Sequence, residues 1–249
     1  MELDLKSLNE QFEDKSATSI IASIYDLFGE SEVKLSTSFG AEGLVLMHLL
    51  AQAVKHPRIF TIDTGRNFQE TYDVWQKVME KYKVPIEVYY PAPQDIAALN
   101  NQAGPNLFYE SVENRKQCCF IRKVKPLENA LKDAKVWISG LRRQQGETRN
   151  ELDIISWVEK HQVYKICPLA NWFESNVWDM IRNNQIPYNK LHDQGFPTIG
   201  CAPCTRPVRP AEDSRAGRWW WEADEKKECG IHFEDGKVVR KKPGINFSI

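Results

Sequence analysis

The chain has 249 residues, of which 42% are hydrophobic and 27% are charged, a composition typical of a globular protein that buries its own core. Its 33 Lys and Arg residues are balanced by 34 Asp and Glu residues, which excludes the overall positive field that holds a nucleic-acid polymer or an anionic membrane. The opening stretch MELDLKSLNEQFEDKS lacks the apolar core of a signal peptide, and no apolar run is long enough to span a bilayer. We therefore expect a cytoplasmic protein with no membrane partner and no nucleic-acid partner.

Helical and strand-like patterns alternate along most of the chain. LKSLNEQF (5–12) and SIIASIYDLF (19–28) have the apolar spacing of amphipathic helices. Short apolar runs then predict buried strands, with helix-like stretches such as EGLVLMHLLAQAV and FQETYDVWQKVMEKY between them. The predicted strands cover residues 33–38, 58–63, 86–90 and 136–140. This alternation predicts an α/β fold with a doubly wound, mainly parallel sheet, whose ligands bind beyond the carboxyl ends of the strands.

The chain changes character beyond about residue 190. The stretch from GFPTIGCAPC to KKECGIH is rich in Pro, Gly, Arg and Trp and shows no helical or strand periodicity. We expect an irregular C-terminal segment held by ligands, ending in a mobile tail. The predicted organisation is a nucleotide-binding domain over 1–205 and a C-terminal segment over 206–249.

Two polar turns follow neighbouring predicted strands. STSFGAEG (36–43) offers three hydroxyls and two glycines before a helix, and DTGRNFQET (63–71) begins with Asp63 and Thr64. Such turns can present backbone N–H groups and a helix N-terminus to a phosphate, although Ser and Thr also serve as ordinary helix caps. Two of them at one sheet edge favour a nucleotide site over capping alone.

A third turn, SGLRRQQGETR (139–149), places Arg142, Arg143 and Arg149 just beyond the last predicted strand. Arginine forks bind phosphate or sulfate oxygens bidentately. A solvated charged loop is the alternative, and the position beyond the sheet edge favours the anion site.

The spacing of the cysteines carries the strongest chemical signal. Without an export signal, six cysteines indicate reduced thiols that bind a metal or react. Four of them form two close pairs, Cys118–Cys119 and Cys201–x–x–Cys204, and four thiolates suit either zinc or an iron–sulfur cluster. Adjacent helical residues diverge by about 100°, so this spacing favours a [4Fe–4S] cluster over a single zinc ion; a vicinal disulfide is the remaining alternative.

The other two cysteines contrast with each other. Cys229 in KKECGIH has polar neighbours, which is typical of a reactive thiol, whereas Cys167 in VYKICPL has the apolar neighbours of a core residue. His232 is a candidate partner for Cys229. The aromatic run in RWWWE (218–222) could stack on a base, but packing is its commoner role.

Taken together, STSFGAEG, DTGRNFQET, CCFIRKVKPL, SGLRRQQGETR, CAPCTRPV, RAGRWWWE and ECGIH resemble the assimilatory sulfonucleotide reductases, in particular the bacterial, cluster-containing adenylylsulfate (APS) reductases. The resemblance implies an adenine nucleotide alpha hydrolase-like fold. It also implies APS as the substrate, because both cysteine pairs are intact, and a [4Fe–4S] cluster on Cys118, Cys119, Cys201 and Cys204.

The resemblance also implies a mechanism. Cys229 would attack the sulfate sulfur, AMP would leave, and the resulting S-sulfocysteine would be cleaved by thioredoxin or a glutaredoxin-like reductant. Lys123 and His232 would belong to the catalytic group. The expected substrate-binding residues are Ser36, Ser38, Phe39, Gly40, Asp63, Thr64, Arg142, Arg143, Arg215 and Arg218. The oligomeric state stays open, a homo-oligomer included.

Three alternatives remain at this point. The enzyme could reduce the 3'-phosphorylated nucleotide PAPS, or both nucleotides. An ATP pyrophosphatase of the same fold with a zinc site is a second alternative, although STSFGAEG departs from the Ser-Gly-Gly-x-Asp-Ser type of pyrophosphate loop. The third is a non-catalytic metal-binding sensor of oxidants, which would have no use for two nucleotide-like turns.

Overall fold

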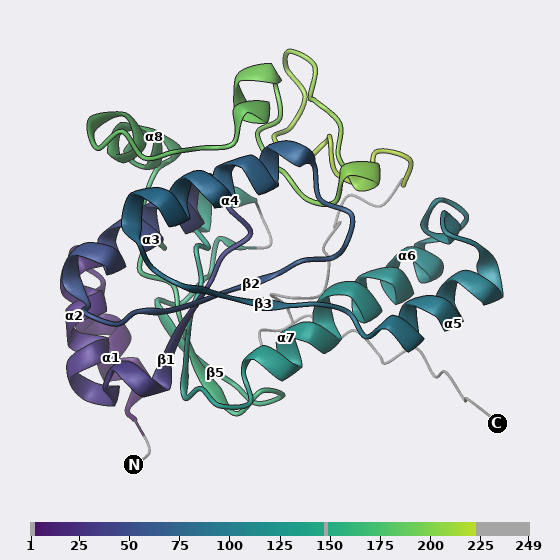
Figure 1. Ribbon diagram of the computed structural model, residues 1–249. Helices are drawn as coiled ribbons and strands as arrows, with labels where there is room; N and C mark the ends of the chain where they lie inside the picture. The colour runs from purple at the N-terminus through teal and green to yellow at the C-terminus, as the bar shows by residue number, and fades with distance from the viewer. Residues whose placement is uncertain (1–2, 147–148, 223–249) are drawn as a thin grey trace.

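The computed structural model describes residues 3–146 and 149–222, and a six-stranded sheet lies at its centre (Figure 1). The strands are β1 (Val33–Ser36), β2 (Arg58–Ile62), β3 (Ile86–Tyr89), β4 (Val136–Ile138), β5 (Ile155–Val158) and β6 (Val163–Ile166). Their order is β3-β2-β1-β4-β6-β5, and every neighbouring pair is parallel except β5 with β6. The predicted doubly wound, mainly parallel sheet is confirmed.

Helices cover both faces of this sheet. In Figure 1, α3 (Ala41–Ala53), α4 (Gln69–Tyr82) and α8 (Glu174–Asn183) lie on one side, and α7 (Lys125–Ala130) lies on the other beside α5 (Pro93–Ala103) and α6 (Val112–Cys119). The N-terminal helices α1 (Leu5–Phe12) and α2 (Ala17–Phe28) join the first side, where α2 contacts α3 and α1 contacts β5. No helix within 3–146 or 149–222 is long and apolar enough to cross a membrane.

Alternation along the strands divides the core between the two faces. Leu35 and Ile138 point into the larger cluster with α2, α3 and α8, whereas Phe60, Trp137 and Val163 pack against α7. Leu35 pairs in register with both Ile59 and Ile138. Successive side chains of a strand face opposite sides, so strands buried on both faces read as the continuous apolar runs from which they were predicted.

The C-terminal part of the described chain is irregular, as expected. It contains only short helical turns between Lys190 and Cys204, and it is held by an isolated bridge between Thr205 and Arg218. The division at residues 205 and 206 stays a prediction. Cys229, His232 and the expected mobile tail lie outside the described residues.

A buried lysine joins the amino ends of the strands. Lys34 is fully buried, and its Nζ donates to Glu87 Oε2 at 2.9 Å, to Asp133 Oδ1 at 2.7 Å and to the Ala130 carbonyl at 3.0 Å. Burial disfavours the charged amine, but these carboxylates outweigh it and raise the pKa of Lys34. The network lies at the end of the sheet opposite the polar turns.

Substituting Lys34→Met should lower the free energy of unfolding by about 2 kcal/mol, because it leaves a buried carbonyl without its donor and leaves the two carboxylates with Arg58 as their remaining cation. The carboxylates are 39% and 59% exposed, so water limits the cost. Burial opposes ionisation of Asp133, but hydrogen bonds from Lys34 and Arg58 outweigh it and lower the pKa of Asp133 to about 2. The difference in free energy of unfolding between the variant and the unaltered protein should therefore be largest at pH values above the ordinary pKa of a carboxyl group. It should shrink as the pH falls towards 2. Urea unfolding at several pH values measures it, with the exposed Lys77→Met as control; equal stability of the Lys34 variant at pH 7 would contradict the role of the network.

Candidate functional site

A cavity of about 310 Å³ lies at the carboxyl ends of the parallel strands. It is bounded by the turns after β1, β2 and β4, by Lys123 before α7, and by residues 197–201 and 214–219 of the C-terminal part. The expected site residues that line it are Ser36, Ser38, Gly40, Thr64, Lys123, Arg142, Cys201, Arg215 and Arg218. A second hollow of about 400 Å³ on α8 is lined by none of the expected residues.

The turn after β1 is shaped by close backbone approaches. A Cβ atom on Gly43 would lie 2.7 Å from Thr37 Oγ1, and one on Gly140 would lie 2.9 Å from Glu42 Cβ. Glycine at these positions lets α3 begin directly beneath the end of β4. As a result, residues 40–43 at the N-terminus of α3 line the cavity, where the positive end of the helix dipole favours an anion.

Phe39 anchors this turn instead of facing the cavity. Its backbone has a positive φ of 59°, its N–H donates to Thr37 Oγ1 at 3.0 Å, and its ring stacks on Trp75 at a centroid distance of 5.3 Å. The side chain is buried in the main core. The structure thus places Phe39 behind the site and not among the lining residues, and its expected role in substrate binding stays a prediction.

Asp63 also shapes a turn and does not line the cavity. Its Oδ1 accepts from Gly65 N at 2.8 Å, from Asn67 Nδ2 at 3.1 Å and from Tyr72 Oη at 3.0 Å. Burial and this carboxylate raise the pKa of Tyr72 to about 12. Asp63 therefore holds the turn so that the next residue, Thr64, faces the cavity.

The two adjacent arginines after β4 point to different places. Arg142 lines the cavity, and its Nε and Nη2 both lie 2.9 Å from Glu42 Oε1. Arg143 instead pairs with Glu13 and donates from Nε to the Leu152 carbonyl at 2.9 Å. Only Arg142 is therefore placed for a ligand in the cavity, and the expected contact from Arg143 is not supported by its position.

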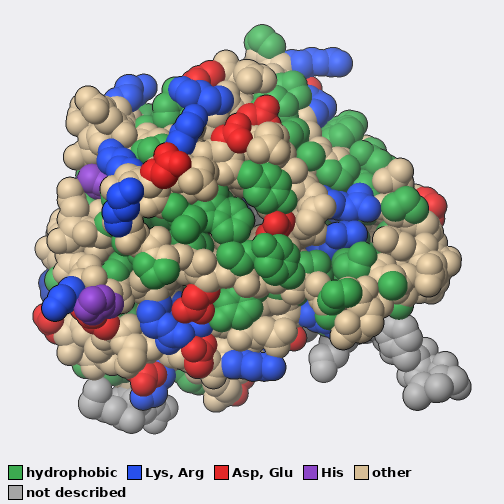
Figure 2. Space-filling model, in the orientation of Figure 1, with side chains coloured by type: hydrophobic (Ala, Val, Ile, Leu, Met, Phe, Trp, Pro, Cys, Tyr) green, Lys and Arg blue, Asp and Glu red, His purple; other side chains and the backbone are tan. Residues whose placement is uncertain are grey.

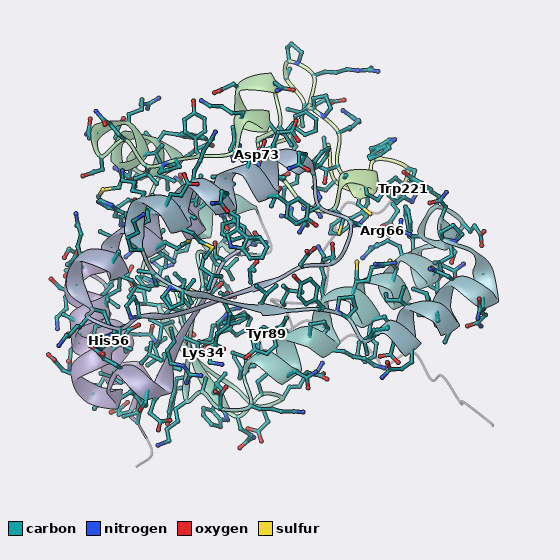
Figure 3. All side chains as sticks on the ribbon, in the orientation of Figure 1. Lys34, His56, Arg66, Asp73, Tyr89 and Trp221 are labelled. Carbon is teal, nitrogen blue, oxygen red and sulfur yellow. The ribbon has the colours of Figure 1, made fainter. Side chains whose placement is uncertain are left out.

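The four cysteines of the two pairs meet in one buried cluster. Cys118 and Cys119 end α6, Cys201 and Cys204 come from the C-terminal loop, and each is 7–8% exposed. Their apolar neighbours are Leu99, Leu107, Phe108 and Trp219. Figure 3 shows sulfur atoms beside Arg66 and Trp221, where the C-terminal loops meet the end of α6. Within 3–146 and 149–222, no three Cys, His, Asp or Glu side chains are grouped as ligands of one metal ion.

The chain after the first cysteine pair continues as a π-helical turn, Phe120–Val124. Such wide turns are frequent at functional sites. Here the turn places Lys123 in the cavity wall, while Arg122 is buried and donates from Nη1 to the Thr64 carbonyl at 2.7 Å. The cysteine cluster and the cavity therefore share one short segment.

Burial and charge act differently on the individual thiols. Burial, together with repulsion from Cys201, raises the pKa of Cys204 to about 12. Burial also opposes ionisation of Cys201, but Lys123, a hydrogen bond from Thr64 and Arg218 outweigh it and lower the pKa of Cys201. Thr64 Oγ1 lies 3.3 Å from Cys201 Sγ. Cys201 is thus the thiol that joins the cysteine cluster to the cavity.

Several residues of the site were not singled out from the sequence. Glu42 and Gln145 form a polar network beside Arg142, with Gln145 Nε2 donating to Glu42 Oε1 at 2.8 Å. Both lie within the turns STSFGAEG and SGLRRQQGETR, and their place in these motifs is the sequence signal for them. Arg115 lies one helical turn before Cys119 and pairs with Glu222; its spacing from Cys119 was the available signal.

The surface gives no sign of a broad polyanion-binding face in the view of Figure 2, where basic and acidic side chains are interspersed. The basic side chains that could bind a ligand instead lie around the cavity. Lys123, Arg142, Arg215 and Arg218 all line the cavity. This distribution suits a small anionic ligand.

The chain is similar to known sulfonucleotide reductases over most of its length. The chain is 46% identical to adenosine 5'-phosphosulfate reductase from Allochromatium vinosum over 200 residues, which cover 80% of this chain and 78% of that protein. The crystal structure of phosphoadenylyl-sulfate reductase from Candida auris superimposes with a TM-score of 0.70 at 26% identity, covering 84% of this chain and 99% of that one.

More distant structures share only the fold. FMN adenylyltransferase from Candida glabrata superimposes with a TM-score of 0.56 at 14% identity and covers 98% of this chain and 81% of that one. The predicted adenine nucleotide alpha hydrolase-like fold is confirmed, as is the resemblance to the sulfonucleotide reductases. Residues 32–207 match the model of the phosphoadenosine phosphosulfate reductase domain, and the chain belongs to this family.

Proposed function

We propose that this protein is an APS reductase of assimilatory sulfate reduction, which converts APS to sulfite and AMP at the expense of a thioredoxin-like dithiol. The observation that carries the proposal is the junction between the cavity and the buried cysteines, made by Thr64, Lys123 and Cys201. The relative from Allochromatium vinosum is named for APS reduction. Both cysteine pairs are intact in this chain, which favours APS over PAPS.

We also propose that the four cysteines hold a [4Fe–4S] cluster. Two hydrogen-bond donors near the cysteines support the fit. Arg122 Nε and Trp221 Nε1 are buried and lack a hydrogen-bond acceptor within the described chain. Sulfide and thiolate sulfurs would supply acceptors. Burial and mutual repulsion also disfavour thiolates at Cys118 and Cys204, so the set requires cationic iron among the sulfurs to ionise fully. When bound, the cluster would supply a fixed field beside the substrate.

The residues of the cavity divide the binding of APS between them. The hydroxyls of Ser36 and Ser38 and the start of α3 suit the nucleotide phosphate. Arg215, Arg218 and Lys123 suit the sulfate group at the end nearest the cysteines. This arrangement would hold the phosphosulfate bond between neutral hydrogen-bond donors on the phosphate side and cations on the sulfate side, and the donors at the phosphate would stabilise AMP as the leaving group.

The reaction would proceed in two steps at Cys229. Its thiolate would attack the sulfate sulfur, the bond from that sulfur to the phosphate oxygen would break, and AMP would leave with the electron pair. A dithiol would then attack Cys229 Sγ and release sulfite through a mixed disulfide, and its second thiol would close a disulfide in the reductant. The dithiol supplies both electrons. His232 would assist ionisation of Cys229.

The test of this proposal is product analysis with anaerobically purified protein. APS, PAPS or ATP is supplied with and without reduced thioredoxin or glutaredoxin, and AMP, sulfite and pyrophosphate are measured. We expect AMP and sulfite from APS only when the dithiol is present. Sulfite from PAPS alone would assign the sister activity, whereas pyrophosphate formation from ATP would assign a pyrophosphatase.

The different positions of the adjacent arginines predict different effects on binding. Arg142→Ala should weaken AMP binding about tenfold, or about 1.4 kcal/mol, because Glu42 would then face the phosphate with the neutral Gln145 in place of its cationic partner. Arg143→Ala should change the affinity for AMP by less than about twofold, since its guanidinium pairs with Glu13 and donates to the Leu152 carbonyl outside the cavity. Calorimetric titration with AMP compares the two. Equal losses for both variants would show that Arg143 reaches the ligand after all.

A further inference from the structure

The last residue that the structure describes, Glu222, is held by a buried ion pair. Arg115 donates from Nε to Glu222 Oε1 and from Nη2 to Glu222 Oε2, each at 2.8 Å. Both side chains are only 2% exposed. Two parallel hydrogen bonds between a guanidinium and a carboxylate fix direction as well as distance. The pair therefore fixes one point of the C-terminal chain against α6.

The same arginine faces both the cysteine cluster and the wall of the cavity. Its Cζ lies 4.6 Å from the centroid of the Trp219 ring, and Arg218 Cζ lies 4.5 Å from the same centroid. Trp219 and Arg218 line the cavity, and Arg115 also interacts with the thiol of Cys119. One ion pair thus connects α6, the cavity wall and the chain that continues towards Cys229.

The backbone around Trp219 adds to this attachment. Trp219 has a positive φ of 45°, its N–H donates to the Cys204 carbonyl at 3.3 Å, and Glu222 N donates to the Trp219 carbonyl at 2.9 Å. A left-handed tryptophan is strained and persists only where its surroundings hold it. The tight turn that it forms aims the Glu222 side chain back at Arg115, so the chain is held at a defined point and in a defined direction.

Packing alone does not require charge at this place. Apolar residues of similar volume usually fill a buried position with equal or greater stability. The ring of Trp219 beside Arg115 already provides an apolar surface. What a buried fork-to-carboxylate pair adds is a unique orientation. The pair is therefore suited to a function that depends on the position of Glu222, from which the rest of the chain continues.

We propose that the ion pair of Arg115 and Glu222, called the clasp below, fixes the position from which the chain continues to Cys229. Both residues are then positioning residues for sulfonate transfer to this cysteine. This inference rests on the proposed function. Cys229 follows Glu222 by seven positions, a span of at most about 25 Å. Because a displacement of about 1 Å in a reacting group can cost a hundredfold in rate, releasing the clasp slows transfer without weakening nucleotide binding.

The kinetic test compares Glu222→Gln with a matched control, Glu212→Gln. Glu212 accepts a similar fork from Arg206 at 2.8 and 3.1 Å, but that pair is 27–30% exposed. In single turnovers with APS and no reductant, Glu222→Gln should form S-sulfocysteine about tenfold more slowly than the unaltered protein. Its affinity for AMP and its visible absorption should be unchanged, and Glu212→Gln should match the unaltered protein. An unchanged rate in Glu222→Gln would overturn the proposal.

A distance measurement separates failure of the clasp from failure of the proposed function. Spin labels are placed on Cys229 and on Lys77→Cys, an exposed position of α4, and the distribution of distances between them is recorded. It should broaden in Glu222→Gln and stay the same in Glu212→Gln. If the unaltered protein forms no S-sulfocysteine, the proposed function fails, and broadening still supports the clasp. An equal width in all three proteins overturns it.

Discussion

Cys229→Ser should abolish sulfite formation, with a loss of about a thousandfold or more, because a serine hydroxyl neither ionises near neutral pH nor forms the S-sulfo adduct. The variant should still bind AMP, since all the residues that line the cavity lie between Ser36 and Trp219 in the sequence. It should also keep the visible absorption of the cluster, because its four proposed ligands are unaltered. Sulfite and AMP assays, nucleotide titration and the visible spectrum measure the three properties on one preparation.

The control for this substitution is the other cysteine outside the two pairs. Cys167 is 1% exposed and belongs to the main core at the end of β6, so Cys167→Ala should lose some stability and keep its turnover. Substantial sulfite release by Cys229→Ser would rule out the covalent intermediate. Loss of AMP binding in the same variant would instead show that the substitution disturbs the cavity.

The fold was predictable because its central strands are buried on both faces. The four predicted strands correspond to β1 to β4, each shorter by one to two residues at its carboxyl end. β6 lies at the start of the apolar stretch VYKICPL, which was predicted to lie in the core. β5 was not predicted, because it is an antiparallel edge strand whose residues after Ile155 are only partly buried. An edge strand shows a weaker apolar run than a central one.

The site was predictable as a set of turns but not side chain by side chain. A motif shows that residues share a turn, whereas backbone conformation decides which of them face the cavity. The positive φ of Phe39 turns its ring into the core, and the N–H groups and hydroxyl around Asp63 occupy its carboxylate. Arg142 and Arg143 are neighbours in sequence, yet only one has Glu42 beside it.

The long-range partners could not be read from the sequence at all. The pairing of Arg115 with Glu222 and that of Lys34 with Asp133 each join positions about a hundred residues apart. No local pattern encodes such a contact, because it depends on how the sheet and the C-terminal segment come together. By contrast, the convergence of the four cysteines was predictable, since two close pairs of thiols have little reason to occur in a reduced protein without a shared ligand.

Cys201→Ser should remove the iron of the proposed cluster and, with it, nearly all of the proposed sulfite formation. Serine oxygen is a harder and more basic ligand than thiolate and binds cluster iron poorly. Cys201 also touches Thr64 and contributes to the wall of the cavity, so its loss should reach the substrate site as well as the cysteine cluster. Iron and sulfide content, together with the visible spectrum, provide readouts that do not depend on turnover.

The matched control is Cys167→Ser, which changes an equally buried thiol outside the set. It should lower stability through burial of a hydroxyl and keep the iron and sulfide content of the unaltered protein. Zinc in place of iron in the unaltered protein would assign the four thiolates to a single ion. Full iron content in Cys201→Ser would exclude Cys201 as a ligand and leave it as a residue of the cavity wall, where its contact with Thr64 already places it. The two serine variants therefore distinguish a thiol that binds iron from one that only fills space.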